Sequence, residues 1–511
     1  MGEYSSKRVK TAGLTRRDVL IGTTSAAVTS LAGCLSDDNN DAGPVRVGLN
    51  SDPAGGDWGQ YGGVVPYYTP FQETLTAAPP DLNGVDPNLA TDWEHRDKTT
   101  WQFELREGVS FHDGTELTAD VAADALAALI EAHPIGFTRF EPDSFSAVGE
   151  YELEIETTQP EPATPGNLAH PLMSLQHPDA DEPVGTGPYR VESVEAEAPV
   201  EAEIFEEYWA DSASVPLVFE GVTDPQTRTL QLESGELDVA FDLPRGRYDD
   251  LRENDELTAR TRTEPRTGMI MVNKYRGPTA DRDLRRALLY ATDQQELVVE
   301  LLDDVGELAR SPFSKVIEWS AHGELSDYTD MERARELRER SGYEGEPLRF
   351  IISGSESEQQ LIAEELQRRW AKIDIEVDIE QVEPAAFFSQ YQGGEADLAF
   401  VELGSINGAA DYLVYVMFHS EGGDNRQQFE NDGTGVVNPG EGVDELIEKG
   451  DTAFDEAAKH DAYREVQHRV MDEGVTIPIY YKEYVLGTRG AIEGPDLHAI
   501  PHMTDWTTLD R

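Results

Sequence analysis

The segment from Ala396 to Leu403 is a short, nearly continuous apolar run followed by Gly404. A run of this length with few polar residues is typical of a strand that is buried on both faces. Such strands occur in sheets that have helices packed on both sides. The segment therefore predicts an α/β fold.

Three other segments alternate between apolar and polar residues, which is the pattern of a strand buried on one face. They are 45–49, 101–105 and 150–156. In the last of these, apolar residues alternate with glutamates. The alternation predicts half-buried strands whose outer faces are acidic.

Helical spacing of apolar residues recurs between these strands. Thr118 is a predicted N-cap for a helix that continues through Leu129. A second helix is predicted over 283–303. Ser355 begins a capping-box pattern for a third helix, which leads into an alternating strand over 373–380. Both element types thus occur along the chain, as an α/β fold requires.

Acidic residues dominate the charge of the chain. Asp and Glu total 100 against 41 Lys and Arg, which gives a formal charge of -59. The hydrophobic share of 38% and the periodic segments indicate a folded protein with an acidic coat. This coat repels itself in dilute salt, but near 1 M salt the Debye length falls to about 3 Å, so we expect a halophilic source. The same charge argues against nucleic acid as a partner, because no basic patch is present to displace phosphate counterions.

The first 34 residues have the order of an export signal that ends in a lipidation site. Arg16 and Arg17 precede a mildly apolar run over 20–32, which is too short to span a hydrocarbon core of ~30 Å. Paired arginines before such a run are typical of twin-arginine signals. The run ends in Leu31-Ala32-Gly33-Cys34, which is a lipobox pattern. The alternative is that Cys34 is an ordinary buried residue and the arginines are a chance pair.

We therefore predict a signal peptide over 1–33, a lipid on Cys34 and a flexible linker over 34–43. Cys34 is the chain's only cysteine, which excludes a disulfide within the monomer and a Cys-based metal cluster. The 11 histidines show no clustered pattern. No metal site, cofactor or catalytic residue is predicted.

Several segments in the mature chain occur in the order found in one known family. They are Leu89 to Glu94, Trp101 to Val121, Gly185 to Tyr189, Tyr208-Trp209, Leu232 to Asp238, Asn273-Lys274 and Asp283 to Asp293. Together they resemble the signature of the family 5 extracellular solute-binding proteins, here of haloarchaeal type. These are the large dipeptide, oligopeptide and nickel-type receptors of ABC importers.

The resemblance implies a two-lobed, periplasmic-binding-protein-like (type II) fold with an extra domain. Two lobes close over the ligand, and the importer recognises the closed form. Carried onto this chain, lobe I takes 44–75, 184–272 and 478–511, the extra domain 76–183, and lobe III 273–477.

Two of these motifs also have a simple structural interpretation. His112 lies in the turn His112-Asp113-Gly114-Thr115 and has no partner at a metal-like spacing, so we interpret it as a turn residue. Gly185-Thr186-Gly187 lacks the GxxxxGK[ST] pattern of a phosphate loop. We predict a tight turn at the entry of a strand there.

The resemblance places the ligand between the lobes, against the loop after the first strand and a lobe III segment that usually reads Trp-Gly-x-Asp. The corresponding segment runs from Leu403 to Asp411. Leu403 replaces the usual Trp, and Ile406 replaces the Asp that pairs with a peptide's α-amine. We predict Leu403, Ser405, Asn407 and Asp411 as ligand-binding residues. A buried ammonium without a carboxylate is costly, so either Asp411 replaces the missing acid through a shifted loop or the ligand has no such amine. The alternative for Asp411 itself is a solvated loop acid.

Aromatic residues also gather in the loop after the first strand, at Trp58, Tyr61, Tyr67 and Tyr68. Trp58 and Tyr61 are predicted to line a cleft for apolar or ring-bearing solutes. The alternative is that these rings pack into core contacts.

The sequence therefore predicts a monomeric, non-enzymatic receptor that is lipid-anchored on the extracytoplasmic face of the cell membrane. Its expected partners are a small solute, peptide-like before sugar or metal chelate, and the permease and ATPase subunits of an ABC importer. The competing hypothesis is an exported lipoprotein enzyme such as a hydrolase, but the chain has no G-x-S-x-G or H-E-x-x-H motif.

Overall fold

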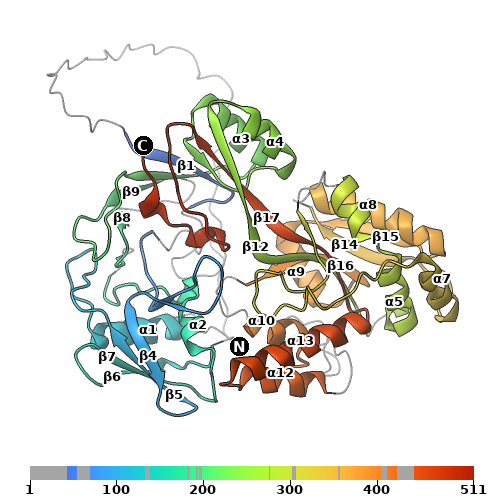
Figure 1. Cartoon of the computed structure of the whole chain (residues 1–511), viewed down its shortest axis with the longest axis horizontal. Helices are drawn as coiled ribbons and strands as arrows, with labels where there is room; N and C mark the ends of the chain where they lie inside the picture. The colour runs from blue at the N-terminus through green and yellow to red at the C-terminus, as the bar shows by residue number, and fades with distance from the viewer. Residues whose placement is uncertain are drawn as a thin grey trace, which may run out of the picture. The chain divides into compact units, whose positions relative to one another are not determined.

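An eleven-stranded mixed sheet runs through the described part of the chain (Figure 1). The structure is a computed structural model that describes residues 43–53, 70–132, 138–180, 184–191, 194, 198–274, 277–301, 306–354, 357–405, 411–422 and 442–511. The predictions for Arg16, Arg17 and Cys34 lie outside these residues. No helix in the described ranges is both long and apolar enough to cross a membrane.

The sheet consists of two halves that are joined by two long strands. The strand order is β15-β14-β16-β12-β17-β11-β1-β10-β9-β8, with β13 paired to β17. The first half contains β1 (Val45–Leu49), β8 (Tyr189–Val191), β9 (Val200–Ile204), β10 (Leu217–Gly221) and β11 (Val239–Ala240). The second half contains β14 (Leu348–Ser353), β15 (Val377–Val382) and β16 (Leu398–Gly404). Each half has a parallel centre, because β1 is parallel to β10 and β11, and β14 is parallel to β15 and β16.

The two joining strands are β12 (Leu257–Val272) and β17 (Thr476–Arg489), which we call the crossing strands. They pair antiparallel from Leu257 with Arg489 to Met271 with Thr476. β17 also pairs with β11 of the first half, and β12 pairs with β16 of the second half. The pairing slips between Thr263 and Thr267 and again between Gly268 and Met269. Such irregularities bend a strand, so the connection between the two halves is a natural place for a hinge.

Each half of the sheet has a separate hydrophobic core. In the first half, Val45, Phe219 and Trp506 belong to one buried cluster. In the second half, a larger cluster includes Phe350, Trp370 and Phe400. The helices are α3 (Pro225–Ser234) and α4 (Tyr248–Glu253) in the first half, and α5 (Arg282–Ala291), α6 (Gln294–Glu296), α7 (Met331–Arg340), α8 (Ser357–Trp370) and α9 (Pro384–Gln392) in the second.

A smaller unit lies between β1 and β8 in the sequence, and we call it the extra domain. Its four-stranded sheet has the order β4-β5-β7-β6, from β4 (Ala90–His95), β5 (Thr100–Leu105), β6 (Phe145–Ala147) and β7 (Glu152–Glu156). Its helices are α1 (Ala119–Ala132) and α2 (Thr164–Leu168), and a small hairpin is formed by β2 (Thr76–Ala77) and β3 (Asp86–Pro87). It has its own core around Phe103, Phe111 and Leu153. The boundaries proposed from the sequence stay a prediction.

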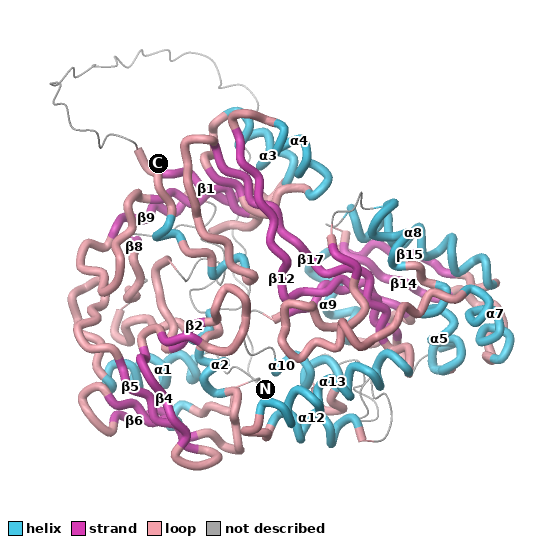
Figure 2. Tube along the Cα trace, viewed as in Figure 1, coloured by secondary structure: helices cyan, strands magenta, loops and turns pink. Residues whose placement is uncertain are grey.

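In the described part of the segment between β16 and β17 there are three helices. They are α10 (Asp411–Phe418), α12 (Val443–Asp451) and α13 (Glu456–Asp472). Figure 2 shows the helices of this segment in cyan. Val414, Ile447 and Tyr463 from these helices belong to the core of the second half. The remaining elements are short: β13 (Glu307–Leu308), the π-helical η6 (Leu297–Leu301), and the 3-10 helices η2 (Pro142–Ser144), η3 (Pro171–Met173), η4 (Arg245–Arg247), η5 (Gly277–Ala280), η7 (Ala371–Ile373), η9 (Pro501–Met503) and η10 (Trp506–Thr508).

The predicted strands and helices are mostly confirmed, with two corrections. The single helix predicted over 283–303 is wrong, because α5 ends at Ala291 and Thr292 is extended. The Thr292 hydroxyl donates to Leu288 O at 2.8 Å, and the Asp293 side chain accepts from Glu296 N at 3.0 Å. Thr and Asp favour such local bonds over the helix interior, so they divide the helix here.

The second correction concerns the strand predicted over 373–380. β15 begins at Val377, because Asp374 adopts the left-handed conformation with φ 57 after a short helical turn. The Ser355 capping-box pattern lies outside the described residues. For β16, burial on both faces is confirmed from Leu398 to Val401 only.

Candidate functional site

The carboxyl ends of the parallel strands carry polar residues in both halves of the sheet. Asn50 follows β1 and Asp242 follows β11, and Asn50 Nδ2 donates to Asp242 Oδ2 at 3.0 Å. In the second half, Ser405 follows β16. Open α/β sheets bind ligands beyond the carboxyl ends of their parallel strands. The site is therefore expected around these three positions.

Asp242 has an unusual backbone, with φ 48 in the left-handed region. Its carbonyl accepts a hydrogen bond from Nη2 of the buried Arg228 at 2.6 Å, which helps to hold this conformation. A non-glycine residue in this region costs of order 1–3 kcal/mol and persists where its surroundings fix it, often at a functional site.

Lys482 of β17 lies at the centre of the charged residues around the crossing strands. Its Nζ is 3.3 Å from Glu402 Oε2 of β16, and the two side chains are only 17% and 16% exposed. The Tyr480 hydroxyl donates to the other Glu402 oxygen. Burial opposes the charge on Lys482, but Glu402, Asp242 and Glu264 outweigh it and raise its pKa above the ordinary value.

The neighbouring acids respond to Lys482 in different ways. Burial would raise the pKa values of Asp242 and Glu402, but Lys482 and a hydrogen bond to each acid lower both below the ordinary range. Glu264 of β12 is 4% exposed, and Arg266 Nε is 3.8 Å from its carboxylate. Burial raises the pKa of Glu264, and Lys482 and Arg266 only partly offset the effect.

Arg245 adds a contact between the two halves of the sheet. It comes from η4 in the first half, and its guanidinium lies over the Tyr480 ring at 4.8 Å. Its Nη2 is 3.6 Å from Glu358 Oε2 on α8 of the second half. We call Asp242, Arg245, Glu264, Arg266, Glu402 and Lys482 the crossing cluster.

Two of the predicted ligand residues lie next to this cluster. Leu403 is partly exposed and pairs with Thr267 of β12. Ser405 is 3% exposed, and its N–H donates to Pro265 O at 3.2 Å. Trp58, Tyr61 and Asn407 lie outside the described residues. The roles of all these residues in ligand binding stay predictions.

Asp411 is in a different environment from the one that a solvated loop acid would have. It begins α10, it is 4% exposed, and Lys459 Nζ is 2.9 Å from its Oδ2. The solvated alternative is therefore wrong. A ligand amine at Asp411 would compete with Lys459 for the same carboxylate.

The sequence reasoning missed the crossing cluster. Lys482 follows the apolar run Ile477 to Tyr481, and Glu402 interrupts the apolar strand β16. Burying an unpaired charge is costly, so a charge inside an apolar strand signals a buried partner. Asp242 gives no such signal, because its backbone conformation cannot be read from the sequence.

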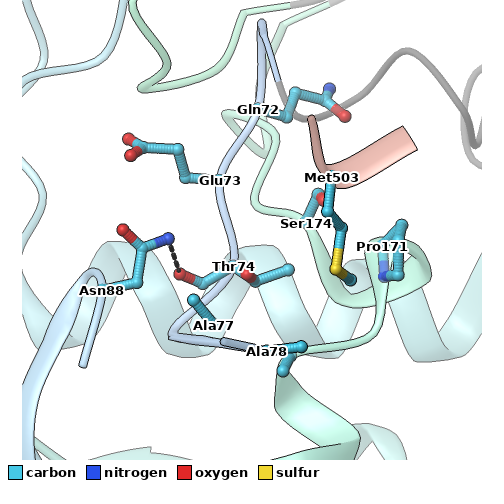
Figure 3. A pocket seen from close by; sticks show the side chains of 10 residues that line it. Gln72, Glu73, Thr74, Ala77, Ala78, Asn88, Pro171, Ser174 and Met503 are labelled. Carbon is cyan, nitrogen blue, oxygen red and sulfur yellow. Dashed lines mark hydrogen bonds between the residues drawn. The ribbon is translucent and has the colours of Figure 1, made fainter. Parts of the chain in front are cut away.

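A small cavity lies elsewhere, between the extra domain and Met503 (Figure 3). It has a volume of about 150 Å³ and is lined by Gln72, Glu73, Thr74, Ala77, Ala78, Asn88, Ala169, Pro171, Ser174 and Met503. Glu73 already accepts hydrogen bonds from Thr186 Oγ1, Tyr208 OH and Trp209 Nε1 at 2.8, 3.0 and 3.1 Å. Burial nevertheless raises its pKa to about 7. Ligand pockets usually measure about 300–1,000 Å³, so this cavity is too small for a peptide.

The predicted roles of His112 and the glycine motif are confirmed as structural. His112 Nε2 is 2.9 Å from Gly187 O, and Gly185 N donates to Nδ1 at 3.3 Å. A side chain at Gly185 would lie 2.1 Å from Phe71 O, so only glycine fits this turn before β8. Within the described ranges, no group of three or more His, Cys, Asp or Glu is placed to hold a metal ion.

This chain is similar in sequence and fold to known solute-binding proteins. The nickel-binding protein NikA of Staphylococcus aureus is 23% identical over 418 residues, covering 79% of this chain and 82% of that protein. Di/tripeptide-binding protein 1 of Pseudomonas aeruginosa is 24% identical over 440 residues, covering 77% and 80%. The crystal structure of NikA from Brucella suis in complex with Fe(III)-EDTA superposes with a TM-score of 0.80 at 18% identity, covering 91% of this chain and 99% of that one.

The predicted fold class is confirmed by these relatives, which have the two-lobed α/β binding-protein fold. They are solute-binding proteins and not enzymes. A profile described as "Bacterial extracellular solute-binding proteins, family 5 Middle" matches residues 84–425. The chain therefore belongs to the family 5 extracellular solute-binding proteins, the substrate receptors of ABC importers.

Proposed function

We propose that this protein is the lipid-anchored, extracytoplasmic receptor of an ABC importer and captures a small, peptide-like solute between the two halves of its sheet. The crossing cluster supports this proposal most strongly. It brings buried charges of both signs from both halves to the carboxyl ends of the parallel strands. The closed receptor then delivers the solute to the permease.

A solute that itself carries both charges suits this cluster. A carboxylate can take a place beside Arg245 or Lys482, and an ammonium group can take a place beside Glu264 or Glu402. Charge-assisted bonds of this kind are about twice as strong as neutral ones. They offset the removal of both charges from water when their geometry is good and the remaining polar atoms are hydrogen-bonded. Peptides have this pair of groups at their two ends.

Ligand capture follows from the way in which the two halves are joined. A solute that touches both halves gains its full set of contacts only when the halves are close, so it shifts the population toward the closed state. The irregular pairing of β12 and β17 near Glu264 provides the place where the halves can move. The proposed lobes are 44–75, 184–272 and 478–511 for lobe I and 273–477 for lobe III.

A metal complex that brings its own ligands is the second candidate. The named relatives include nickel-binding proteins, and one structure holds Fe(III)-EDTA. The part of the chain that the structure describes has no group of side chains able to hold a bare ion. A chelate with carboxylates and amines presents the same charges as a peptide, so both candidates fit the crossing cluster.

Thermal-shift measurements on the full chain carrying Cys34→Ser, in molar KCl, test the function directly. The ligands are di- and oligopeptides, oligosaccharides, and nickel complexes of histidine. A ligand at 100 times its dissociation constant adds about 2.7 kcal/mol, which raises the melting temperature of a chain of this length by roughly 3 °C. A response to peptides alone supports the proposal, whereas a response to the nickel complex alone selects the second candidate. A folded protein that responds to none contradicts both.

A matched pair of variants tests whether the ligand binds at the crossing cluster. Glu402→Gln changes a buried acid beside Lys482, and we expect it to weaken binding of the identified ligand at least tenfold. Glu339→Gln changes an exposed acid on α7 and is the control. Equal affinities in the two variants would place the ligand elsewhere.

The membrane anchor has its own test. Cys34→Ser should release the exported protein into the medium, and replacement of Arg16 and Arg17 by Lys should block its export. Retention of the Cys34→Ser protein at the membrane would contradict lipidation. Gel filtration in molar KCl tests the proposed monomer.

A further inference from the structure

The extra domain contacts the helical segment that precedes β17. His95 and Trp101 of the extra domain contact Phe454, and Arg139 of the extra domain pairs with Asp451 and also with Glu161 of its own domain. We call these residues, together with the neighbouring pair Asp411 and Lys459, the clasp. They are independent of the crossing strands. The clasp is therefore a second, noncovalent connection between the part of the chain that follows β1 and the part that follows β16.

The aromatic part of the clasp is formed by Phe454, which follows α12. Its ring centroid is 4.9 Å from His95 and 6.3 Å from Trp101, and its ring is nearly parallel to that of Trp101. Phe454 packs against the core of the extra domain. The helices on either side of Phe454 in the sequence, α12 and α13, belong to the core of the second half. The Phe454 side chain is half-buried.

The ionic part of the clasp is formed by Arg139. Its Nε is 2.7 Å from Glu161 Oε2 within the extra domain, and its Nη2 donates to Asp451 Oδ2 at 3.0 Å. The three side chains are 22%, 7% and 12% exposed. One guanidinium thus binds two buried carboxylates, of which one belongs to each unit.

The surrounding charges do not balance. Asp411, paired with Lys459, lies close enough to Glu161 to affect its ionisation. Among the described residues here, Glu161, Asp411 and Asp451 are three buried carboxylates that share two cations, Arg139 and Lys459. A buried charge without a partner is costly, so one bound proton would complete the balance.

We propose that the clasp parts when the two halves of the sheet swing open and that its carboxylates take up one proton when it closes. This inference rests on the proposed function, because it assumes that the halves move to admit a solute. The topology supports it: β12 and β17 join the halves at one place, and the clasp joins the extra domain to helices that pack on the second half at another. The extra domain is tied to the first half by the hydrogen bond from the Tyr208 hydroxyl to Glu73, so a bend at the crossing strands displaces one side of the clasp relative to the other.

The direction of the pH dependence follows from the buried acids. Burial raises the pKa of Glu161 to about 8 and that of Asp451 to about 6. Arg139 and the Tyr463 hydroxyl oppose the shift at Asp451, and the neighbouring carboxylates reinforce the shift at Glu161. A parted clasp exposes these acids to water, where they ionise near pH 4. The closed clasp therefore binds more protons, and it weakens as the pH rises from about 6 to 8.

Other titratable groups also face the clasp. His419 and Glu448 come from the ends of α10 and α12, and His95 stacks on Phe454. His170 of the extra domain lies against Tyr412 of α10, and burial lowers its pKa well below the usual value. The Glu161→Gln variant distinguishes proton binding by the clasp carboxylates from titration of these histidines, because it removes one acid and leaves the histidines unchanged.

Two spin-label distances test the proposal in the full chain carrying Cys34→Ser, which has no other cysteine. Cysteines at the exposed positions Val148 and Lys449 report the clasp, and cysteines at Leu230 and Leu361 report the two halves of the sheet. The double variant Arg139→Met and Phe454→Ala breaks the clasp. Its control is Arg96→Met with Phe388→Ala, which changes an arginine and a phenylalanine that are both about half exposed.

We expect the broken clasp to lengthen and broaden both distances by electron spin resonance in molar KCl, and the control to change neither. A longer 148–449 distance with an unchanged 230–361 distance would overturn the coupling to opening, and no change in either would overturn the clasp itself. In the protein with an intact clasp, the 148–449 distance should lengthen between pH 6 and pH 9. In the Glu161→Gln variant the 148–449 distance should not lengthen between pH 6 and pH 9. If it lengthens as much as in the parent protein, the proposed proton uptake is wrong. These distance measurements need no added solute. They therefore test the clasp even if none of the ligands in the thermal-shift screen binds.

Discussion

Among the described residues, the crossing cluster and the clasp each contain three carboxylates that are fully or largely buried, but they differ in the number of cations that accompany them. Asp242, Glu264 and Glu402 share Lys482, Arg245 and Arg266, and Arg245 also pairs with the more exposed Glu358. At the clasp, three acids share Arg139 and Lys459. The two sites therefore have similar burial but different charge balance.

The difference shows in the direction of the pKa shifts. Lys482 helps to lower the pKa values of Asp242 and Glu402, although burial acts against it. At the clasp, burial dominates and raises the pKa values of Glu161 and Asp451. Glu264 is the exception in the crossing cluster, since its nearest cation is 3.8 Å away. The charge state of a buried acid thus depends on the distance to the nearest cation as well as on burial.

The largest expected effect comes from removing the central cation of the crossing cluster. Lys482→Met leaves the partner acids buried without their ammonium group, and breaking a buried ion pair costs about 3–5 kcal/mol. We expect a loss of at least about 3 kcal/mol in the free energy of unfolding, measured by denaturant titration in molar KCl. The control is Lys372→Met, an exposed position with an expected change below about 0.5 kcal/mol.

The double variant Lys482→Met with Glu402→Gln sharpens this result. If the two groups interact directly, the loss in the double variant is smaller than the sum of the single losses. Simple addition of the two losses would mean that Lys482 is balanced by other groups.

The next largest effect is a dependence of stability on pH at the clasp. The pKa of Glu161 is raised to about 8 in the folded state and lies near 4.3 in the unfolded chain, so the folded state binds more protons between these values. Stability then falls as the pH rises through this window, with a slope of up to ~1.4 kcal/mol per unit from this group. Unfolding curves between pH 5 and 8 should show a flatter dependence for Glu161→Gln, and an unchanged slope would contradict the raised pKa.

Much of the fold could be predicted from local patterns. The alternation in 101–105 and 150–156 corresponds to β5 and β7, and the Thr118 cap precedes α1. The errors arose where a polar side chain ends an element from within an apolar pattern, as at Thr292 and Asp374. Hydrophobic spacing records burial, but it contains little information about such local hydrogen bonds and backbone angles.

Less of the candidate site could be predicted. The resemblance to a family indicated 403–411, and Leu403 and Ser405 do lie beside the crossing cluster. The cluster itself combines residues from β12, β16, β17 and η4, which are far apart in the sequence. Asp411 was judged by its position in a loop motif, whereas its burial depends on Lys459, which is 48 positions later. Pairings of this kind form only in the folded chain.

Phe454→Ala measures the aromatic part of the clasp. Truncating a fully buried Phe costs about 3–5 kcal/mol, so this half-buried ring should cost about 2 kcal/mol. Phe388→Ala is the matched control, because that ring is 52% exposed. Calorimetry should separate the two variants by about 2 °C in melting temperature. Equal melting temperatures would mean that the contact between the extra domain and α12 contributes nothing to stability.

The smallest effects come from two buried tyrosines that make the same bond in the two clusters. Tyr480 donates to Glu402 in the crossing cluster, and Tyr463 Oη donates to Asp451 Oδ1 at 2.9 Å in the clasp. Each Tyr→Phe change removes one hydrogen bond and should cost about 1 kcal/mol.

For Tyr480→Phe this loss of stability should be constant from pH 6 to pH 8, because Lys482 keeps Glu402 ionised. For Tyr463→Phe the pKa of Asp451 rises further above 6, so the loss should grow as the pH increases through that value. Parallel pH profiles for the two variants would show that charge balance does not distinguish the two clusters.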